Sequence, residues 1–224
     1  MGGDAELTAL EADVSRSAIE AVDRVLADSG AGPTLLAIMV AAIDGRATVD
    51  GRSGGLGHPA DRALMRELRG RADALLVGSR TLEIERYGNL IDADVRERRL
   101  ERGQPPHPPV ATIVRSGNLS PDIPLLSEPD VEVKVYTELD PPALKADLAR
   151  IGDGLIVCEG GPHLLAHLMS AGVVDGVLLT LAPYAVGSGL TIVEGLPEAA
   201  PLSLRSVQRA GDHLFMHYTP AASS

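Results

Sequence analysis

The chain has 224 residues, of which 45% are hydrophobic, a formal net charge of −11 and a single cysteine, Cys158. This length and composition predict a globular chain, and no apolar stretch reaches the roughly 20 residues that a membrane span needs. The acidic balance argues against nucleic acid as a partner, and one cysteine excludes an internal disulfide or a cysteine-rich zinc site. We therefore expect a cytoplasmic protein that acts on a small molecule and contacts neither a membrane nor nucleic acid.

The first half of the chain alternates between helical periodicity and apolar runs. In residues 5–29 the apolar side chains recur at the spacing of one helix face. We therefore predict a helical extension at 1–30 and the main domain at 31–224. The apolar run 34–45 predicts a buried strand that enters a turn at Asp44. A glycine-rich segment leads into a helix from Pro59, a short strand and turn follow, and 83–109 reads as a long loop with at most one short helix.

The second half continues the alternation and ends differently. Strands are predicted within 110–119, 131–137, 154–161 and 173–187, with helices starting at proline in 141–152 and 162–172. Residues 202–219 predict a β-hairpin that turns at Gly211 and Asp212. This order predicts an α/β fold with a mainly parallel central sheet, helices on both faces and an antiparallel C-terminal hairpin.

The end of one predicted strand is a candidate for a binding site. The apolar run LIVC stops at Glu159, and Gly160, Gly161 and Pro162 follow directly. Ligands of open parallel sheets bind beyond the carboxyl ends of the strands, where glycines admit a ligand to the backbone and the first amides of a helix hold phosphate. The alternative, given equal weight, is a tight turn beside a solvated glutamate.

Two further strand ends carry similar polar groups. Gly78, Ser79 and Thr81 follow one predicted strand, and Arg115 and Ser116 follow another, where an arginine beside a hydroxyl suits a phosphate monoester. Three such ends in one sheet favour a dinucleotide. The chain has no G-x-G-x-x-G and no P-loop motif.

Histidines occur in two pairs with a spacing of four. His163 and His167 fall on a predicted helix, and His213 and His217 on a predicted strand, but neither pair has a third ligand at a metal-binding spacing. We predict no metal site, and we expect Cys158 to be a small core residue.

Three segments together resemble a known family. The stretches AAIDGRATVDGRSG, PADRALMRELRGRADALLVGSRTL and EGGPHLLAHLMSAGVVDGVLLTLAPYAVGSG look like the C-terminal reductase domain of the bifunctional riboflavin-biosynthesis deaminase-reductase, in the same order, over roughly 34–219. The resemblance implies a dihydrofolate-reductase-like fold, NADPH as cofactor, a homodimer, and reduction of a 5-amino-6-(5-phosphoribosylamino)uracil type of substrate.

The resemblance also implies residue roles. It gives Glu159 a substrate-orienting role in catalysis, with Asp44 and Glu85 as candidate proton donors. Cofactor contacts fall on Gly78, Ser79, Thr81, Arg115, Ser116, Gly160, Gly161, Pro162, His163, Leu164 and Leu165, and substrate contacts on Ser53, Arg69, Glu85 and Glu159.

The chain departs from the family pattern in places that concern the substrate. The zinc deaminase half is not in this sequence, and the phosphate-binding arginine that follows the second strand has no clear counterpart in EIERYGNLID, where Glu85 stands for an aspartate. Two alternatives therefore stay open: a reductase of another small molecule such as a dihydropterin, and a nucleotide-binding protein that has lost catalysis.

Overall fold

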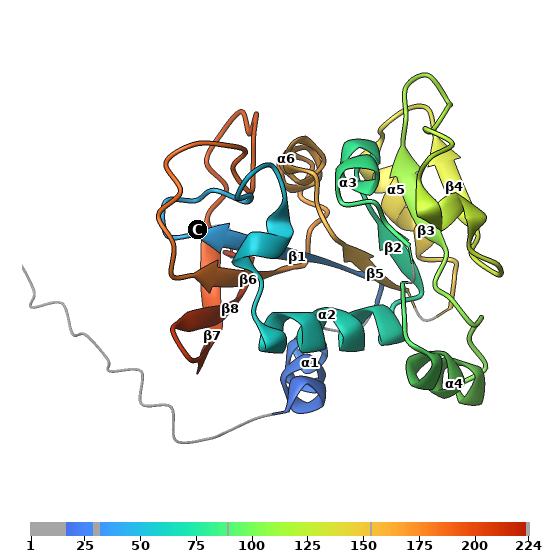
Figure 1. Ribbon diagram of the computed structural model, residues 1–224, viewed down its shortest axis with the longest axis horizontal. Coiled ribbons are helices and arrows are strands. Elements are labelled where there is room, and N and C mark those ends of the chain that lie inside the picture. Colours follow the sequence, from blue (N-terminus) through green and yellow to red (C-terminus); the bar gives the residue numbers. More distant parts are fainter. Residues whose placement is uncertain (1–16, 29–31, 89, 153, 223–224) are drawn as a thin grey trace, which may run out of the picture.

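The fold is built on one eight-stranded sheet, seen in a computed structural model that describes residues 17–28, 32–88, 90–152 and 154–222 (Figure 1). The strands lie in the order β4-β3-β2-β5-β1-β6-β8-β7. Strands β1 to β6 are parallel to one another, whereas β8 is antiparallel to both β6 and β7. The bounds are β1 (Thr34–Ala42), β2 (Ala74–Leu76), β3 (Val110–Ile113), β4 (Val133–Tyr136), β5 (Leu155–Cys158), β6 (Gly176–Ala182), β7 (Leu202–Ala210) and β8 (His213–Pro220).

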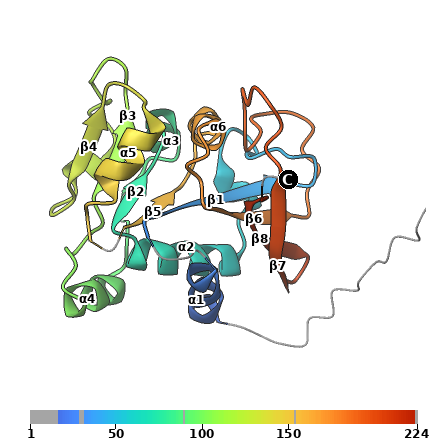
Figure 2. The same ribbon diagram turned by 180° about the vertical axis from the view of Figure 1, so that it is seen from behind.

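Helices cover both faces of the sheet because the side chains of the central strands alternate between two apolar cores. Leu36 and Ile38 of β1 enter one core, and Leu35 and Ala37 enter the other. The first core is closed by α1, α2 and α4 and the second by α5 and α6, on opposite sides of the sheet in both views (Figures 1 and 2). The helices are α1 (Ala18–Ala27), α2 (Pro59–Arg71), α3 (Ser79–Ile84), α4 (Ala93–Glu101), α5 (Pro141–Leu148) and α6 (Pro162–Ser170), with 3₁₀-helices η1 (Ser53–Leu56) and η2 (Pro124–Ser127).

The predicted architecture is confirmed, including the terminal hairpin with its turn at Gly211 and Asp212. Helix α1 lies within the predicted 5–29 helix and begins at a capping box in which Ser17 and Glu20 bond each other's backbone; residues 1–16 and 29–31 fall outside the described residues. Cys158 is fully buried in the core, as expected. None of the described helices combines the length and apolar character needed to cross a membrane.

The prediction was wrong for residues 79–84, which form α3 where a turn was expected. Helix α4 is the one short helix that the expected loop at 83–109 allowed. A six-residue helix spans fewer than two turns, too few for helical periodicity to be visible in the sequence. The helix matters because it carries residues of the candidate site past the end of β2.

Candidate active site

Two adjoining pockets lie at the edge where the parallel strands end. The inner pocket, about 120 Å³, is enclosed by β1, α2, the end of α3 and the turn after β5. The outer pocket, about 830 Å³, lies between α3, the ends of β3 and β4, and the start of α6. The two share a wall formed by Thr81, Ile84, Gly161, Pro162 and Leu190. A ligand that fills the outer pocket can therefore reach into the inner one.

The glycine turn after β5 forms part of this shared wall. Gly160 and Gly161 have φ values of 93° and 74°, a conformation that other residues rarely adopt. The N–H of Gly78 donates to the carbonyl of Gly160 at 2.8 Å, which ties the ends of β2 and β5 together. Gly161, the residue before α6, has no side chain with which to cap the helix, so amides of its first turn stay available to a ligand.

Glu159 lies at the inner pocket, but its carboxylate already has partners within the protein, which the sequence did not indicate. Its carboxylate accepts hydrogen bonds from Arg69 Nε and Nη2, both at 2.6 Å, and from the hydroxyl of Tyr87 at 2.5 Å. The Glu159 side chain is only 1% exposed, and a buried carboxylate is tolerated only with such partners. Glu159 lines the inner pocket while these partners occupy its oxygens.

This buried cluster also fixes the charge states of its members. Burial disfavours the charge of Arg69, but the neighbouring Glu159 carboxylate outweighs it and raises the arginine pKa above its usual value. Burial, and then the charge of Glu159, raise the pKa of the Tyr87 hydroxyl well above its usual range. The Arg69 guanidinium lies 5.3 Å from the centre of the Tyr87 ring. Because Glu159 already neutralises Arg69, this arginine is a poor partner for a phosphate group of the substrate, although the resemblance implies a substrate contact there.

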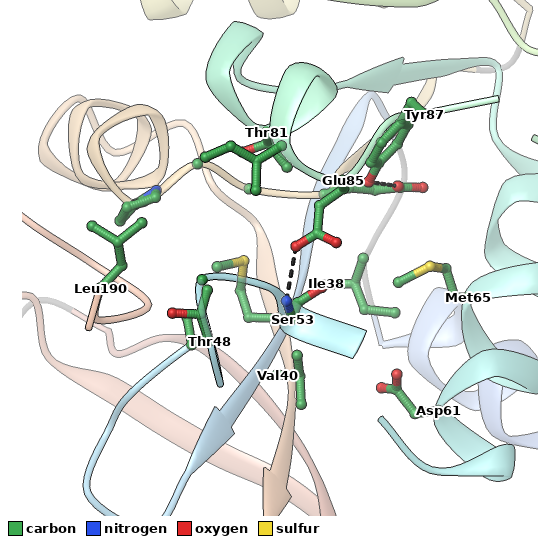
Figure 3. A pocket seen from close by; sticks show the side chains of 18 residues that line it. Ile38, Val40, Thr48, Ser53, Asp61, Met65, Thr81, Glu85, Tyr87 and Leu190 are labelled. Atoms are coloured by element: carbon green, nitrogen blue, oxygen red, sulfur yellow. Dashed lines mark hydrogen bonds between the residues drawn. The ribbon is translucent and has the colours of Figure 1, made fainter. Parts of the chain in front are cut away.

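Glu85 and Ser53 meet at the inner pocket, as expected for residues that contact one ligand. The N–H of Ser53 donates to Glu85 Oε1 at 2.8 Å, which links η1 to the end of α3 (Figure 3). Both residues are half-buried and line the inner pocket. Tyr87, which sequence reasoning did not single out, lies beside them.

Sequence reasoning also missed Asp61, a buried carboxyl group of the inner pocket. Asp61 lies in the first turn of α2, is 6% exposed, and accepts a hydrogen bond from the Thr180 hydroxyl of β6 at 2.6 Å. Burial raises its pKa, although the Thr180 hydrogen bond opposes the shift. Figure 3 shows Asp61 beside Met65, across the pocket from Thr81 and Leu190.

Most of the predicted cofactor residues gather at the outer pocket. Its lining includes Gly78, Ser79, Thr81, Arg115, Gly161, Pro162, His163 and Leu164, together with Arg80 and His167, which the sequence had not indicated for this role. Three predicted residues lie elsewhere. Gly160 lines the inner pocket, Leu165 is buried in the core, and Ser116 is exposed with its hydroxyl bonded to the carbonyl of Asn118.

Asp44 is not brought to either pocket. Its carboxylate accepts the backbone N–H groups of Val186 and Gly187 at 2.9 and 2.6 Å, and these bonds, that of Gly187 foremost, lower its pKa. The carboxyl group thus fastens the loop after β6 to the loop after β1. We withdraw the assignment of Asp44 as a proton donor.

The histidine pairs have other contacts. His163 lies 3.2 Å from the carbonyl of Glu194, and the ring of His213 lies 4.7 Å from that of His58. Across the residues that the structure describes, no three His, Cys, Asp or Glu side chains are grouped so as to hold a metal ion.

The sheet order, the antiparallel hairpin and the joined pockets define a dihydrofolate-reductase-like α/β protein. Dihydrofolate reductase from Enterococcus faecalis, in complex with NADP(H), matches with a TM-score of 0.52 at 16% identity over 84% of this chain and 96% of its own. Residues 33–216 match the family described as the RibD C-terminal domain, and the chain belongs to that family. The resemblance found in the sequence motifs is thereby confirmed.

Individual relatives agree with this assignment. A pyrimidine reductase-like protein from Corynebacterium diphtheriae has a TM-score of 0.69 and 25% identity, covering 85% of this chain and 93% of its own. The RibD structure of Acinetobacter baumannii has a TM-score of 0.69 at 17% identity, with 85% and 58% covered. The riboflavin biosynthesis protein RibD of Mycobacterium tuberculosis is 28% identical over 181 residues, 78% of this chain, and the chain spans about half (50%) of that relative's length.

Proposed function

We propose that this protein is an NADPH-dependent reductase of a riboflavin-pathway ribosylaminopyrimidine. The observation that carries the proposal is the pair of joined pockets in a chain of the RibD C-terminal domain family, the larger with room for a dinucleotide and the smaller with room for a single small ring. Bound NADPH would supply a hydride to a C=N or C=O carbon of the substrate. The chain would hold the two reactants together and keep water from the small inner pocket.

The contacts of the outer pocket support NADPH as the cofactor. The uncapped start of α6, with Gly161 and Pro162 at the shared wall, suits a pyrophosphate. Arg80 and Arg115 are cations at the same pocket, and Arg115 follows β3 where the sequence indicated an adenosine phosphate. We assign Arg115 to the phosphate that distinguishes NADPH from NADH.

This assignment predicts a selective loss. Arg115→Ala should raise the dissociation constant for NADPH about tenfold or more, because it removes one charge-assisted contact. The dissociation constant for NADH should stay nearly unchanged. Fluorescence titration of both cofactors measures it. Arg150→Ala is the matched control, because Arg150 is an exposed arginine outside both pockets, with a side chain 78% exposed. Equal weakening of both cofactors by Arg115→Ala would remove the assignment.

Turnover tests the reaction itself. NADPH absorbance should fall when the enzyme meets the phosphoribosylamino-pyrimidine substrate, whereas a dihydropterin reductase would respond to dihydrofolate. Oxidation of NADPH with neither compound would favour a nucleotide-binding protein without catalysis.

We further propose that the protein is a cytoplasmic homodimer. Leu179 and Leu181 of β6 and Leu214 and Met216 of β8 pair across the strands, project to one sheet face and are only half-buried. A second copy packed on this face would bury them.

A further inference from the structure

In the proposed reaction, the phosphate of the substrate has no cationic partner inside the inner pocket. The described lining of this pocket contains no lysine, arginine or histidine. Arg69 is neutralised by its salt bridge with Glu159, and the arginines of the outer pocket serve the cofactor. Because about 120 Å³ has room for a single small ring, the phosphate of a bound substrate would lie outside the inner pocket.

Two arginines stand directly beside residues of this pocket. Arg52 precedes Ser53 and Arg86 follows Glu85 in the chain, and Ser53 and Glu85 both line the inner pocket. The N–H of Ser53 donates to Glu85 Oε1 at 2.8 Å, so this one hydrogen bond brings the two arginines near each other (Figure 3). Both arginines are exposed. Since an arginine side chain is long and carries its charge at the tip, two guanidinium groups that start so close together can reach one phosphate.

Neither of these arginines is committed to another partner. Within the described residues, no salt bridge and no side-chain hydrogen bond is formed by Arg52 or Arg86, whereas Arg66, Arg71 and Arg98 all pair with carboxylates. A guanidinium group without a counter-charge is available to an anion, and the planar fork of its N–H groups matches two oxygen atoms of a phosphate.

The backbone of Arg86 has a conformation that an arginine rarely adopts. Its φ is 50°, in the left-handed region, directly after the C-cap residue Glu85 of α3. Glycine is the usual residue at this position of a helix end, because a side chain there costs free energy. Backbone strain of this kind favours a functional reason for the side chain. The reason that fits here is a positive charge beside the inner pocket.

We propose that Arg52 and Arg86 bind the phosphate of the substrate and select a phosphorylated ribosylaminopyrimidine over its phosphate-free counterpart. Two guanidinium groups offset the charge of roughly −1.5 to −2 that a phosphate monoester carries at pH 7, and each offers a pair of N–H donors to its oxygen atoms. The segment EIERYGNLID, in which the family's phosphate-binding arginine has no clear counterpart, contains Arg86 instead. This inference rests on the proposed function, which places the pyrimidine ring in the inner pocket.

The sharpest test uses two substrates that differ only in the phosphate. For the wild type, kcat/KM for 5-amino-6-(5-phosphoribosylamino)uracil should exceed that for the same compound without its phosphate by about a hundredfold, or about tenfold for each arginine. Arg52→Ala and Arg86→Ala should each lower this ratio about tenfold, through the phosphorylated substrate alone. Arg150→Ala, at an exposed arginine outside both pockets, is the matched control and should keep the ratio.

The result that would overturn the inference is equally direct. A wild type that turns over both compounds alike, or a preference for the phosphate that survives both substitutions, would remove the two arginines from substrate recognition and leave the proposed reductase function intact.

Arg86→Gly separates phosphate binding from the structural effect of the turn. Glycine relieves the left-handed backbone, so the thermal midpoint should rise by about 1–3 °C. The substrate ratio should nevertheless fall about tenfold, as in Arg86→Ala. A higher midpoint with an unchanged ratio would show that Arg86 is only a strained turn residue, and its assignment would be wrong.

Binding of ribose 5-phosphate separates a failure of this inference from a failure of the proposed function, because calorimetric titration needs no turnover. The double variant Arg52→Ala with Arg86→Ala should weaken this binding at least about tenfold, and Arg150→Ala should not. Should neither pyrimidine oxidise NADPH, the proposed function falls while this titration still decides the role of the two arginines. Binding that is absent from the wild type, or that is lost in Arg115→Ala instead, would overturn the inference.

Discussion

Replacing Glu159 by glutamine tests how the structure holds its central carboxylate. The change keeps the size of the side chain but removes the charge that neutralises Arg69, which is itself largely buried with a side chain 16% exposed. Breaking one partner of a buried ion pair costs about 3–5 kcal/mol, because the other charge is left without compensation. At about 2–4 °C per kcal/mol for a chain of this size, the thermal midpoint should fall by roughly 6–20 °C.

Thermal unfolding followed by circular dichroism measures this shift. Glu85→Gln is the control, because within the described residues this inner-pocket carboxylate accepts a backbone N–H alone, and the change should cost less than about 1 kcal/mol. The double variant Arg69→Met with Glu159→Gln removes both charges and should be less destabilised than the sum of the two single changes by about 0.5–3 kcal/mol. A midpoint for Glu159→Gln within about 2 °C of the wild type, or strictly additive effects, would refute the buried pair.

Two further predictions concern pH and assembly. Burial lowers the pKa of His217 below its usual 6.5, so the unfolded chain binds more protons below that pH, and the free energy of unfolding should be steady above about pH 6.5 and fall below it. Urea titrations between pH 8 and 5 measure the fall, and a His217→Gln variant that keeps the whole fall would refute this source. Sedimentation at micromolar concentration should show a dimer, and Met216→Glu should give a monomer; a monomeric wild type would contradict the homodimer.

The sequence predicted the layers of this fold, a mainly parallel sheet with helices on both faces. It did not predict the order of the strands within the sheet. Apolar runs bounded by glycine predicted β1 and β5, because strands buried on both faces have no polar side. Strand β5 lies between β2 and β1. This position depends on packing between segments that are far apart in the chain, and no local sequence pattern predicts it. The helix α3 was missed because its six residues span fewer than two turns, too few for a helical period to repeat.

The candidate site, too, was predicted only in part from the sequence. Local chemistry located Glu159 and Arg115, since each follows a strand whose carboxyl end faces the pockets. It could not supply the role of Glu159, because Arg69 and Tyr87 are 90 and 72 residues away in the sequence. Without these partners a strand-end glutamate looks free to bind a ligand.

Asp61 is the clearest example of a pocket residue that the sequence alone did not reveal. An acidic residue in the first turn of a helix is expected for the helix dipole alone, so its position in the sequence gives no reason to place it at a pocket. Only the fold brings it against Thr180, 119 residues away, and buries most of it at the wall of the inner pocket. The same folding step leaves the cations Arg80 and Arg115 at the outer pocket. The two pockets of the proposed reaction therefore differ in charge: the charged side chains in the described lining of the inner pocket are acidic, whereas the outer pocket is lined by two arginines.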